Sequence, residues 1–137
     1  MMKIKKSGGK AMKMEELISS EASPALGPYC HGRKMGNIII TSGQIPLTKD
    51  GKFVYEIKEA TKLVLHNLVS IVEAGGGKKE DVARVDVYLK TLDDFDAFNE
   101  AYAEFFGTHK PTRVCTQAAR IAGDVPLEAS MIALVEE

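Results

Sequence analysis

Hydrophobic positions along the chain follow two periods, and each period predicts a different element. Between Glu56 and Ala74, apolar residues recur at steps of three and four, and the run Gly75–Gly77 follows, which predicts a helix that ends at the glycines. A second helix is predicted between Asp93, which is suited to cap it, and Gly107. Its apolar stripe is aromatic and consists of Phe95, Phe98, Tyr102, Phe105 and Phe106.

Alternation of apolar and polar residues predicts strands around these helices. The turn pair Gly36–Asn37 separates two such segments, which together predict a β-hairpin. A turn at Ala122–Pro126 separates the last two segments of the chain. The predicted strands are Glu16–Ser19, Cys30–Met35, Ile38–Gln44, Val82–Lys90, Thr112–Ile121 and Leu127–Val135.

The order of these elements predicts the fold class. Strands come first, followed by a helix, a strand, a helix and a final pair of strands, which favours an α+β sheet with both helices on one face. The opposite face then needs a cover, and packing against another subunit supplies it most simply. The run Ile38–Ile40 agrees, because a strand without alternation is typical of one covered on both faces, by a helix or by a partner subunit.

Length and composition favour a single domain. The chain has 137 residues, of which 45% are hydrophobic, and a chain of this size buries roughly two-thirds of its surface on folding. No apolar run approaches the ~20 residues of a membrane-spanning helix, and the N-terminus lacks the apolar stretch of a secretory signal. We therefore expect a soluble, cytoplasmic protein without a membrane partner.

Charge is distributed unevenly between the start of the chain and the rest. Residues 1–14 carry five Lys and no acid, so residues 15–137 carry a formal −6 although the whole chain carries −1. We interpret residues 1–14 as a flexible basic extension or a remnant of cloning, and residues 15–137 as the domain. A nucleic-acid-binding arm or a transit peptide is the alternative, but the acidic body disfavours nucleic acid as a partner.

Cysteine and histidine spacing indicates neither a disulfide nor a metal site. Cys30 and Cys115 lie far apart in a chain without a secretory signal, which favours free thiols. The three histidines match no zinc motif. The glycine run with Lys78 and Lys79 superficially resembles a phosphate loop, but it follows a helix instead of preceding one, so we interpret it as a helix stop.

Arg113 is the first candidate for binding chemistry. It lies in a predicted strand among small and apolar neighbours, where a merely solubilising charge is not expected. Its planar guanidinium suits a carboxylate, and a charge-assisted hydrogen bond of that kind contributes about 1.5–3 kcal/mol. The alternative is an internal ion pair, for example with Glu128 or Asp124.

Glu128 is the candidate acid or base. It stands one residue into the last predicted strand, and the register of that strand decides which face of the sheet its side chain occupies. With an odd-numbered residue opposite Glu128, its side chain shares a face with Arg113 and Cys115, where the group could hold a carboxylate substrate and orient a water. A slip of one residue places it on the opposite face, and a solvated edge glutamate is the alternative without a function.

Cys115 and Asn99 are weaker candidates. No histidine, asparagine or aspartate is recognisably placed to activate the Cys115 thiol, and a thiol beside β-branched residues is usually inert, so nucleophilic catalysis is disfavoured. Asn99 lies on the aromatic stripe of the second predicted helix, where its amide needs a partner in the core, at a subunit interface or on a ligand.

Several short motifs occur in a fixed order along the chain. They are Gly27-Pro28-Tyr29, Thr41-Ser42-Gly43-Gln44-Ile45-Pro46, the stretch Asn67–Gly75, Asp94-Phe95 through Asn99-Glu100 to Phe106, Pro111-Thr112-Arg113-Val114-Cys115, Ala119-Arg120 and Glu128. In this order they resemble the RidA (YjgF-type) family of reactive-intermediate deaminases. The resemblance runs from about Glu15 to the C-terminus, so only the first fourteen residues lie outside it.

The resemblance implies a chorismate-mutase-like mixed sheet, assembled as a homotrimer around a central β-barrel with active sites between subunits. It implies hydrolysis of 2-imino acids, such as 2-iminopropanoate and 2-iminobutanoate formed from enamines like 2-aminoacrylate, to 2-keto acids and ammonia, with no cofactor. By the same resemblance, Arg113 binds the substrate carboxylate, Glu128 positions water and the backbone at Cys115 contacts the imine. The residues that line or support the pocket, some from the neighbouring subunit, are Tyr29, Ser42, Gly43 and Asn99.

Some positions depart from the family pattern. His31 stands in place of a common Gln, Ala122-Gly123 in place of a Leu-Pro type of turn, and Ser130 where a second acid often follows Glu128. These changes concern pocket shape and substrate size more than the reaction. Two other functions stay open: a non-catalytic module that binds small acids or acts as a chaperone, and an endoribonuclease or translation inhibitor, which the acidic body disfavours.

Overall fold

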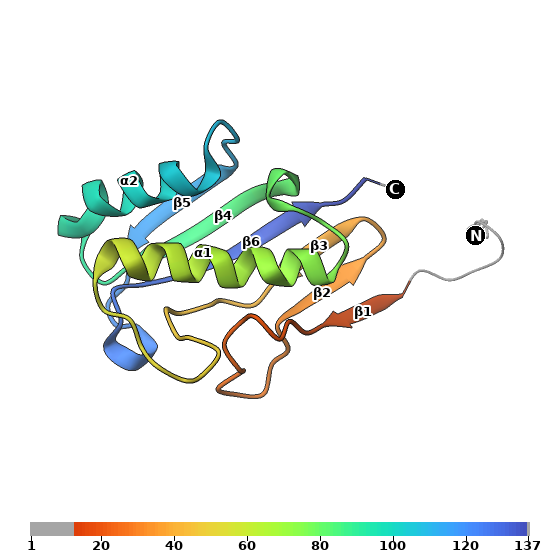
Figure 1. Cartoon of the computed structure of the whole chain (residues 1–137), viewed down its shortest axis with the longest axis horizontal. Helices are drawn as coiled ribbons and strands as arrows, with labels where there is room; N and C mark the ends of the chain where they lie inside the picture. Colours follow the sequence, from red (N-terminus) through yellow and green to blue (C-terminus); the bar gives the residue numbers. More distant parts are fainter. Residues whose placement is uncertain (1–12, 137) are drawn as a thin grey trace.

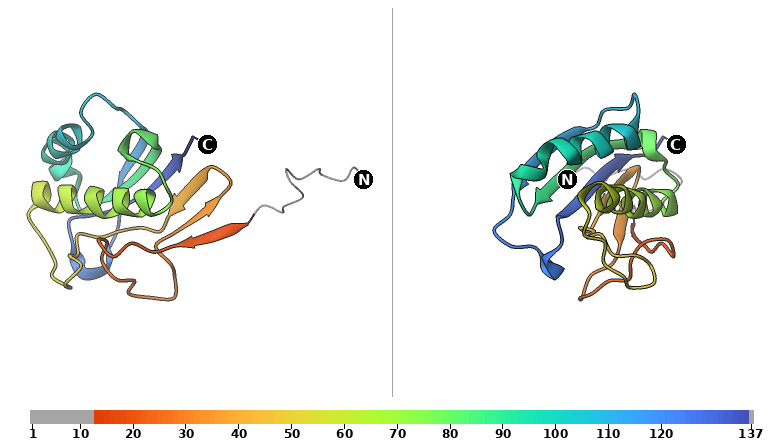
Figure 2. Two further views of the ribbon diagram at one scale, coloured as in Figure 1. Left: turned by 45° about the vertical axis from the view of Figure 1, so that its right-hand side comes forward. Right: turned by 60° about the vertical axis from the view of Figure 1, so that its left-hand side comes forward.

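Two helices cover one face of a mixed sheet in the computed structural model, which describes residues 13–136 (Figure 1). The six strands lie in the order β1-β2-β3-β6-β4-β5; β4 and β5 pair in parallel and the other neighbours pair antiparallel. Figure 2 shows both helices on the same side, which confirms the predicted α+β arrangement. The elements are β1 (Met14–Leu17), β2 (Gly32–Met35), β3 (Ile38–Thr41), α1 (Ile57–Ala74), η2 (Lys79–Asp81), β4 (Val82–Leu89), η3 (Leu92–Asp94), α2 (Phe95–Phe106), β5 (Thr112–Gln117), η4 (Ala122–Asp124) and β6 (Leu127–Leu134).

All six strands differ from their predicted bounds: β4 and β6 each end one residue earlier, β2 begins two residues later, and the other three differ as follows. β3 ends at Thr41 because the next two residues leave the ladder, and pairing resumes only at the single bridge between Gln44 and Ala129. β5 ends at Gln117 because its partner β4 ends there, at Leu89. β1 begins two residues earlier than predicted and includes residue 14, which we had assigned to the basic extension; residues 1–12 of that extension lie outside the described residues.

The helix ends follow capping chemistry, with one correction. α1 begins after Glu56, whose carboxylate accepts a hydrogen bond from Glu59 N, and it ends in the predicted glycine run. Asp93, the predicted cap of α2, lies instead inside η3, and its own N–H donates to Thr91 Oγ1 at 3.1 Å. The prediction was wrong because a 3-10 turn capped by Thr91 precedes the α-helix, whose own N-cap is Asp94, without a side-chain hydrogen bond.

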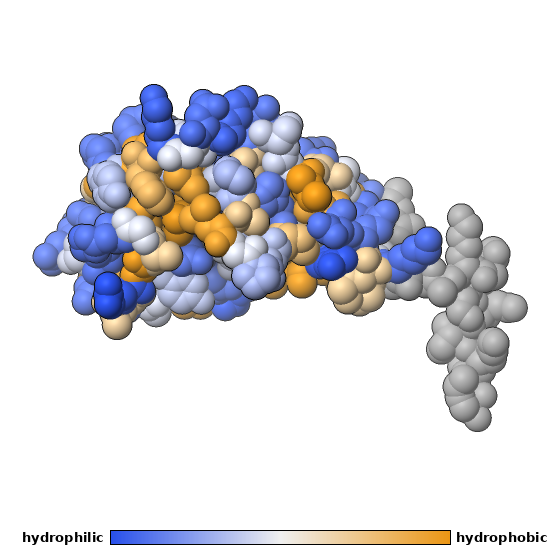
Figure 3. Space-filling model, turned by 90° about the horizontal axis from the view of Figure 1, so that it is seen from below, coloured by the Kyte–Doolittle hydropathy of each residue, from blue (hydrophilic) through white to orange (hydrophobic). Residues whose placement is uncertain are grey.

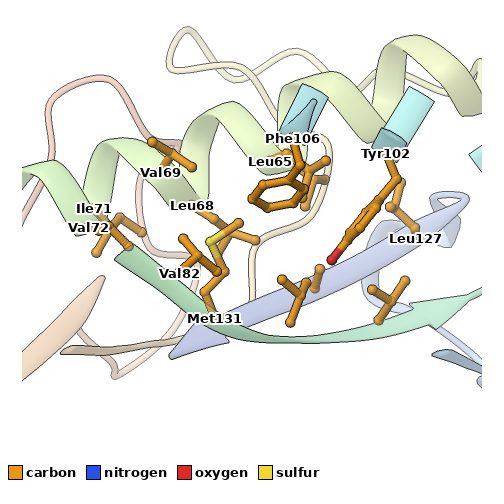
Figure 4. Packing of buried hydrophobic residues seen from close by; sticks show 14 of the residues in the cluster. Leu65, Leu68, Val69, Ile71, Val72, Val82, Tyr102, Phe106, Leu127 and Met131 are labelled. Carbon is orange, nitrogen blue, oxygen red and sulfur yellow. The ribbon is translucent and has the colours of Figure 1, made fainter. Parts of the chain in front are cut away.

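The core fills the space between the helices and one face of the sheet, as Figure 4 shows. Alternate residues of β4, Val85, Val87 and Leu89, are at most 1% exposed, as their alternation predicts. Removing such apolar surface from water is the main stabilising contribution to a fold of this size. The residues that α1 and α2 add to this layer include Val64, Leu65, Leu68, Ile71, Val72, Phe98, Tyr102 and Phe106.

The other face of the sheet is uncovered within residues 13–136. On β3, Ile39 is fully buried beneath α1, whereas Ile38 and Ile40 are 43% and 48% exposed on the opposite face. Leu134 lies beside Ile38 on that face and is also exposed. A single chain therefore covers this strand on one face only, and covering of the second face by a subunit stays a prediction.

Leu68→Ala is expected to lower the free energy of unfolding by about 2–5 kcal/mol, because it removes a fully buried side chain and leaves a cavity under α1. Denaturant titration at a fixed protein concentration measures the effect. Lys62→Ala, on the solvent side of the same helix, is the control and should stay within about 0.5 kcal/mol of wild type. A loss below about 1 kcal/mol for Leu68→Ala would contradict the packing described here.

Candidate active site

The predicted site residues lie in two separate hollows of the chain. The Glu128 cleft, of about 480 Å³, lies where the loop before β2, the segment after β3, η4 and the start of β6 meet. The Arg113 hollow, of about 280 Å³, lies between the second half of α2 and the start of β5 and includes Asn99. The predicted residues that line the Glu128 cleft are Tyr29, Ser42, Gly43 and Glu128.

The register of the sheet explains this separation. β6 does not pair with β5, because β4 lies between them, with Tyr88 opposite Glu128 and Val85 opposite Arg113. Even- and odd-numbered residues of β4 point to opposite faces, so Glu128 faces the open side while Arg113 and Cys115 face the helices. Of the two placements left open by the sequence, all three on one face therefore does not occur within a single chain: the residue opposite Glu128 is the even-numbered Tyr88, and Glu128 lies on the face opposite to Arg113 and Cys115.

Arg113 is held by aromatic rings. Its guanidinium carbon lies 4.8 Å from the ring centre of Tyr102, 5.3 Å from that of Phe98 and 5.8 Å from that of Phe95. No carboxylate lies within 4 Å of it among residues 13–136, and Asp124, the predicted alternative partner, pairs with Lys90. Aromatic faces stabilise a cation without accepting its in-plane N–H bonds, so the donor fork stays available for a carboxylate.

Two buried polar atoms in the Arg113 hollow have no hydrogen-bond partner within the described chain. They are Asn99 Oδ1 and the Tyr102 hydroxyl. Burial raises the pKa of Tyr102 to about 12, so its hydroxyl is protonated at neutral pH and can donate. Buried polar groups in native proteins are normally paired, so the predicted need of Asn99 for a partner is not met within the described residues.

Glu128 is positioned by its contact with Gly43. A Cβ at residue 43 would collide with the Glu128 carboxylate, so a larger residue there would require the glutamate side chain to turn away. The approach is fixed by the neighbouring backbone, because Gln44 N donates to Ala129 O at 2.8 Å and Ala129 N donates to Gln44 O at 3.1 Å. Burial raises the pKa of Glu128, which makes its carboxylate a stronger base than a solvated one.

Tyr29 and Ser42 both line the Glu128 cleft, but hydrogen bonds hold Ser42 more firmly than Tyr29. Ser42 is fixed, because its N–H donates to His31 O at 2.9 Å and its hydroxyl donates to Cys30 O at 2.7 Å. Its oxygen lone pairs remain able to accept from a ligand. Tyr29 is 45% exposed, and its hydroxyl accepts from Leu26 N at 3.2 Å. The cleft thus has one rigid polar edge and one edge that lies on a surface loop.

Cys115 lies half-buried against the core, on the helix-covered face. Burial raises the pKa of its thiol, which keeps it protonated and a poor nucleophile at neutral pH. Within residues 13–136, His, Cys, Asp and Glu side chains form no group of three or more that could hold a metal ion. None of the described helices is long and apolar enough to cross a membrane.

The sequence interpretation missed the aromatic support of Arg113 and the apolar part of the Glu128 cleft. Phe98 and Tyr102 were assigned to the core alone, because a stripe that supports an arginine has the same helical period as one that packs against a sheet. Figure 3 shows a broad hydrophobic area on the side that faces down in Figure 1, where η4 and the loop before β2 lie. Apolar residues that line the cleft are Pro24, Leu26, Ile45 and Ala122.

Comparison with known proteins shows which family the chain is similar to. The family model described as endoribonuclease L-PSP matches residues 20–135. A RutC family protein of Pyrococcus horikoshii is 44% identical over 126 residues, covering 90% of this chain and 100% of the relative. The 2-iminobutanoate/2-iminopropanoate deaminase of Escherichia coli K12 is 40% identical over 126 residues, covering 88% of this chain and 98% of the relative. The crystal structure of E. coli TdcF with bound serine matches with a TM-score of 0.86 and 36% identity, covering 89% of this chain and 99% of that one. The chain therefore belongs to the RidA/YjgF family.

Proposed function

We propose that the chain is a deaminase that hydrolyses 2-iminopropanoate and 2-iminobutanoate to 2-keto acids and ammonia. The observation that carries the proposal is Arg113, a cation held by three aromatic rings beside an open hollow, with no acidic partner among residues 13–136. Such a group suits the carboxylate of a small acid. The E. coli relative named as a deaminase of these two imines and the serine-bound TdcF structure support the same class of substrate.

The reaction needs one water and one group that moves protons. Water adds to the imine carbon while the Glu128 carboxylate accepts a proton from it, and the nitrogen takes up the proton as the carbon becomes tetrahedral. Glu128 then accepts the remaining O–H proton and passes it to the nitrogen, so that collapse of the intermediate forms the keto group, breaks the C–N bond and releases ammonia. Imine plus water thus gives keto acid plus ammonia. A carboxylate whose pKa is raised by burial suits both steps, because it is a stronger base than a solvated carboxylate and returns the proton as a carboxylic acid.

Arg113 and Glu128 act on one small substrate when they come from different subunits. Their side chains lie on opposite faces of the same sheet, and a 2-imino acid is too small to reach both. The open sheet face, with Ile38, Ile40 and Leu134 exposed, supplies hydrophobic area for packing a second copy. The assembly we propose is the homotrimer implied by the family resemblance, with each site formed between two subunits.

A coupled assay tests the proposed function. A pyridoxal-phosphate-dependent serine or threonine dehydratase supplies fresh enamine, and decay of the transient imine is followed with and without the chain. We expect decay to accelerate in proportion to the concentration of the wild-type chain. Imine decay at the spontaneous rate, at every concentration of the chain, would overturn the proposal.

The same assay separates the alternatives. A non-catalytic acid-binding module would bind 2-keto acid saturably and leave the rate of imine decay unchanged. The endoribonuclease activity named in the family description also stays an alternative. The formal −6 of residues 15–137 disfavours it, because RNA binding depends on neutralising phosphate charge.

Mixing two inactive variants tests whether each site spans two subunits. In trimers assembled at random from equal amounts of Arg113→Ala and Glu128→Gln chains, about a quarter of the interfaces join an intact arginine to an intact glutamate. We therefore expect about a quarter of wild-type activity after co-refolding or co-expression. If each active site were contained within one subunit, mixing the two variants would restore no activity. That result would contradict an active site formed between two subunits.

A further inference from the structure

We propose that His31 is a positioning residue for the Glu128 cleft and determines how tightly the cleft holds its substrate. The inference rests on the proposed function, because the substrate concerned is the 2-imino acid. His31 does not line the cleft. It acts through residues 18–31, which join β1 to β2 and form one wall of the cleft.

The imidazole of His31 bridges two points of this loop. Ser19 N donates to His31 Nδ1 at 3.0 Å, and His31 Nε2 lies 2.8 Å from the carbonyl oxygen of Ser23. A backbone N–H only donates and a carbonyl only accepts, so the neutral ring with its proton on Nε2 satisfies both. The side chain is only 6% exposed, so water does not readily replace either partner.

Both bridged serines are tied to the rest of the fold. Ser23 Oγ donates to Gln44 Oε1 at 2.9 Å, and Gln44 is the residue whose backbone pairs with Ala129, next to Glu128. On the other side, Ser19 Oγ donates to Ser70 Oγ in α1 at 2.8 Å. The network therefore connects the loop to the helix layer and to the strand that carries the catalytic carboxylate. Its buried members are Ser19, Ser23, His31, Gln44 and Ser70.

The residues that form the wall of the cleft follow directly after Ser23, the second residue that the His31 ring binds. Pro24, Leu26, Gly27 and Tyr29 line the cleft, and all four are exposed in the single chain. The hydrogen bonds that the described structure gives this stretch are internal: Tyr29 N donates to Gly27 O at 2.9 Å, and Leu26 N donates to the Tyr29 hydroxyl. Its position relative to Glu128 therefore depends on the anchors at its two ends. Ser42 holds the C-terminal end through Cys30 O and His31 O. At the N-terminal end, Ser23 is held by its hydrogen bond to Gln44 and by the His31 ring, which alone binds the Ser23 carbonyl among the described residues.

Loss of the ring has a defined consequence for binding. A buried N–H at Ser19 and a buried carbonyl at Ser23 lose their partner, and the loop can then satisfy them only by moving. The apparent dissociation constant rises as the fraction of molecules with the wall in the competent position falls. The groups proposed to bind and react, Arg113 and Glu128, are untouched, so the chemical step in the bound complex changes little.

Steady-state kinetics of two His31 variants tests the inference. His31→Leu keeps the bulk and removes both hydrogen bonds, and we expect KM to rise about tenfold while kcat stays within about twofold of wild type. His31→Gln carries an acceptor and a donor on one side chain, and we expect it to restore KM to within about threefold of wild type. If His31→Leu does not fold, His31→Asn takes its place, because its shorter amide reaches only one partner and should give an intermediate KM.

A purely structural role would not give this pattern. Leu68→Ala, which destabilises the core beneath α1 without touching the loop, is the matched control and should leave KM unchanged. A wild-type KM in His31→Leu, an equal rise in Leu68→Ala, or no rescue by His31→Gln would overturn the inference.

Amide hydrogen exchange provides a readout that does not depend on activity. We expect residues 19–29 to lose protection in His31→Leu and to keep it in His31→Gln. Unchanged protection in His31→Leu would also overturn the inference. Failure of the wild-type chain to hydrolyse imines would instead overturn the proposed function, and hydrogen exchange would still decide whether His31 positions the loop.

Discussion

Arg113→Ala is expected to lower kcat/KM for 2-imino acid hydrolysis by at least about 100-fold and to leave the fold intact. Each charge-assisted hydrogen bond to a carboxylate contributes about 1.5–3 kcal/mol, and the guanidinium offers two in parallel. Loss of the arginine also frees the substrate to rotate relative to the attacking water. The fold should tolerate the change, because no acidic partner among residues 13–136 is left unpaired.

The measurement is the coupled imine-decay assay, with size-exclusion chromatography on the same preparation to verify the oligomer. Arg113→Lys keeps the charge but loses the planar fork, so its activity should fall between wild type and Arg113→Ala. Lys62→Ala removes a positive charge from the outer side of α1 and should be fully active. Activity of Arg113→Ala within about threefold of wild type would show that the carboxylate is held elsewhere.

The elements of the fold that local pattern controls could be predicted from the sequence. Apolar residues recur with a period of 3.6 residues in α1 because one side of the helix faces the sheet. In β4 they alternate with polar residues because one face of the strand lies against the helices. The end of α1 at Gly75 follows from the glycine run. Each of these features depends on residues within one helix or strand, so the local sequence is enough to predict it.

The face occupied by Glu128 could not be predicted in this way. β5 and β6 are consecutive in the chain, and the turn signal at Ala122–Pro126 between them is also how a hairpin looks in sequence, although residues 118–126 connect the two strands in the structure. In the structure, β6 inserts between β3 and β4, and its register is set by pairing with residues about 40 and 90 positions earlier in the chain. That pairing is long-range, and no local motif encodes it.

In the candidate site, too, residue identities could be predicted from the sequence, whereas their arrangement in space could not. Residue type and position, together with the family resemblance, identified Arg113 and Glu128, but they did not show that one chain keeps the two residues in separate hollows. His31 was noted only as a departure from the family pattern, because its two partners, Ser19 and Ser23, are backbone groups. Backbone hydrogen bonds leave no mark on residue identity, so the anchoring of the loop becomes visible only in the folded chain.

Glu128→Gln is expected to lower kcat by about 10²–10⁴-fold with little change in KM, because an amide of the same size cannot accept a proton from water. The substrate carboxylate would still bind Arg113. Asp86→Asn is the control for loss of charge and should keep kcat. It removes a carboxylate from the same open face of the sheet, on the neighbouring strand β4, where Asp86 lies opposite Ser130 and pairs with Arg84 outside the lining of the cleft. A fall in kcat equal for the two variants would indicate a general effect of charge.

The pH profile distinguishes loss of a base from a change in shape. Burial raises the pKa of Glu128, so the protonated, inactive carboxyl persists to a higher pH than an ordinary glutamic acid would. In wild type, kcat/KM should therefore rise with pH as Glu128 ionises, and this acidic limb should be absent from the residual activity of Glu128→Gln. An identical acidic limb in both proteins would assign it to another group and remove Glu128 from the proton-transfer step.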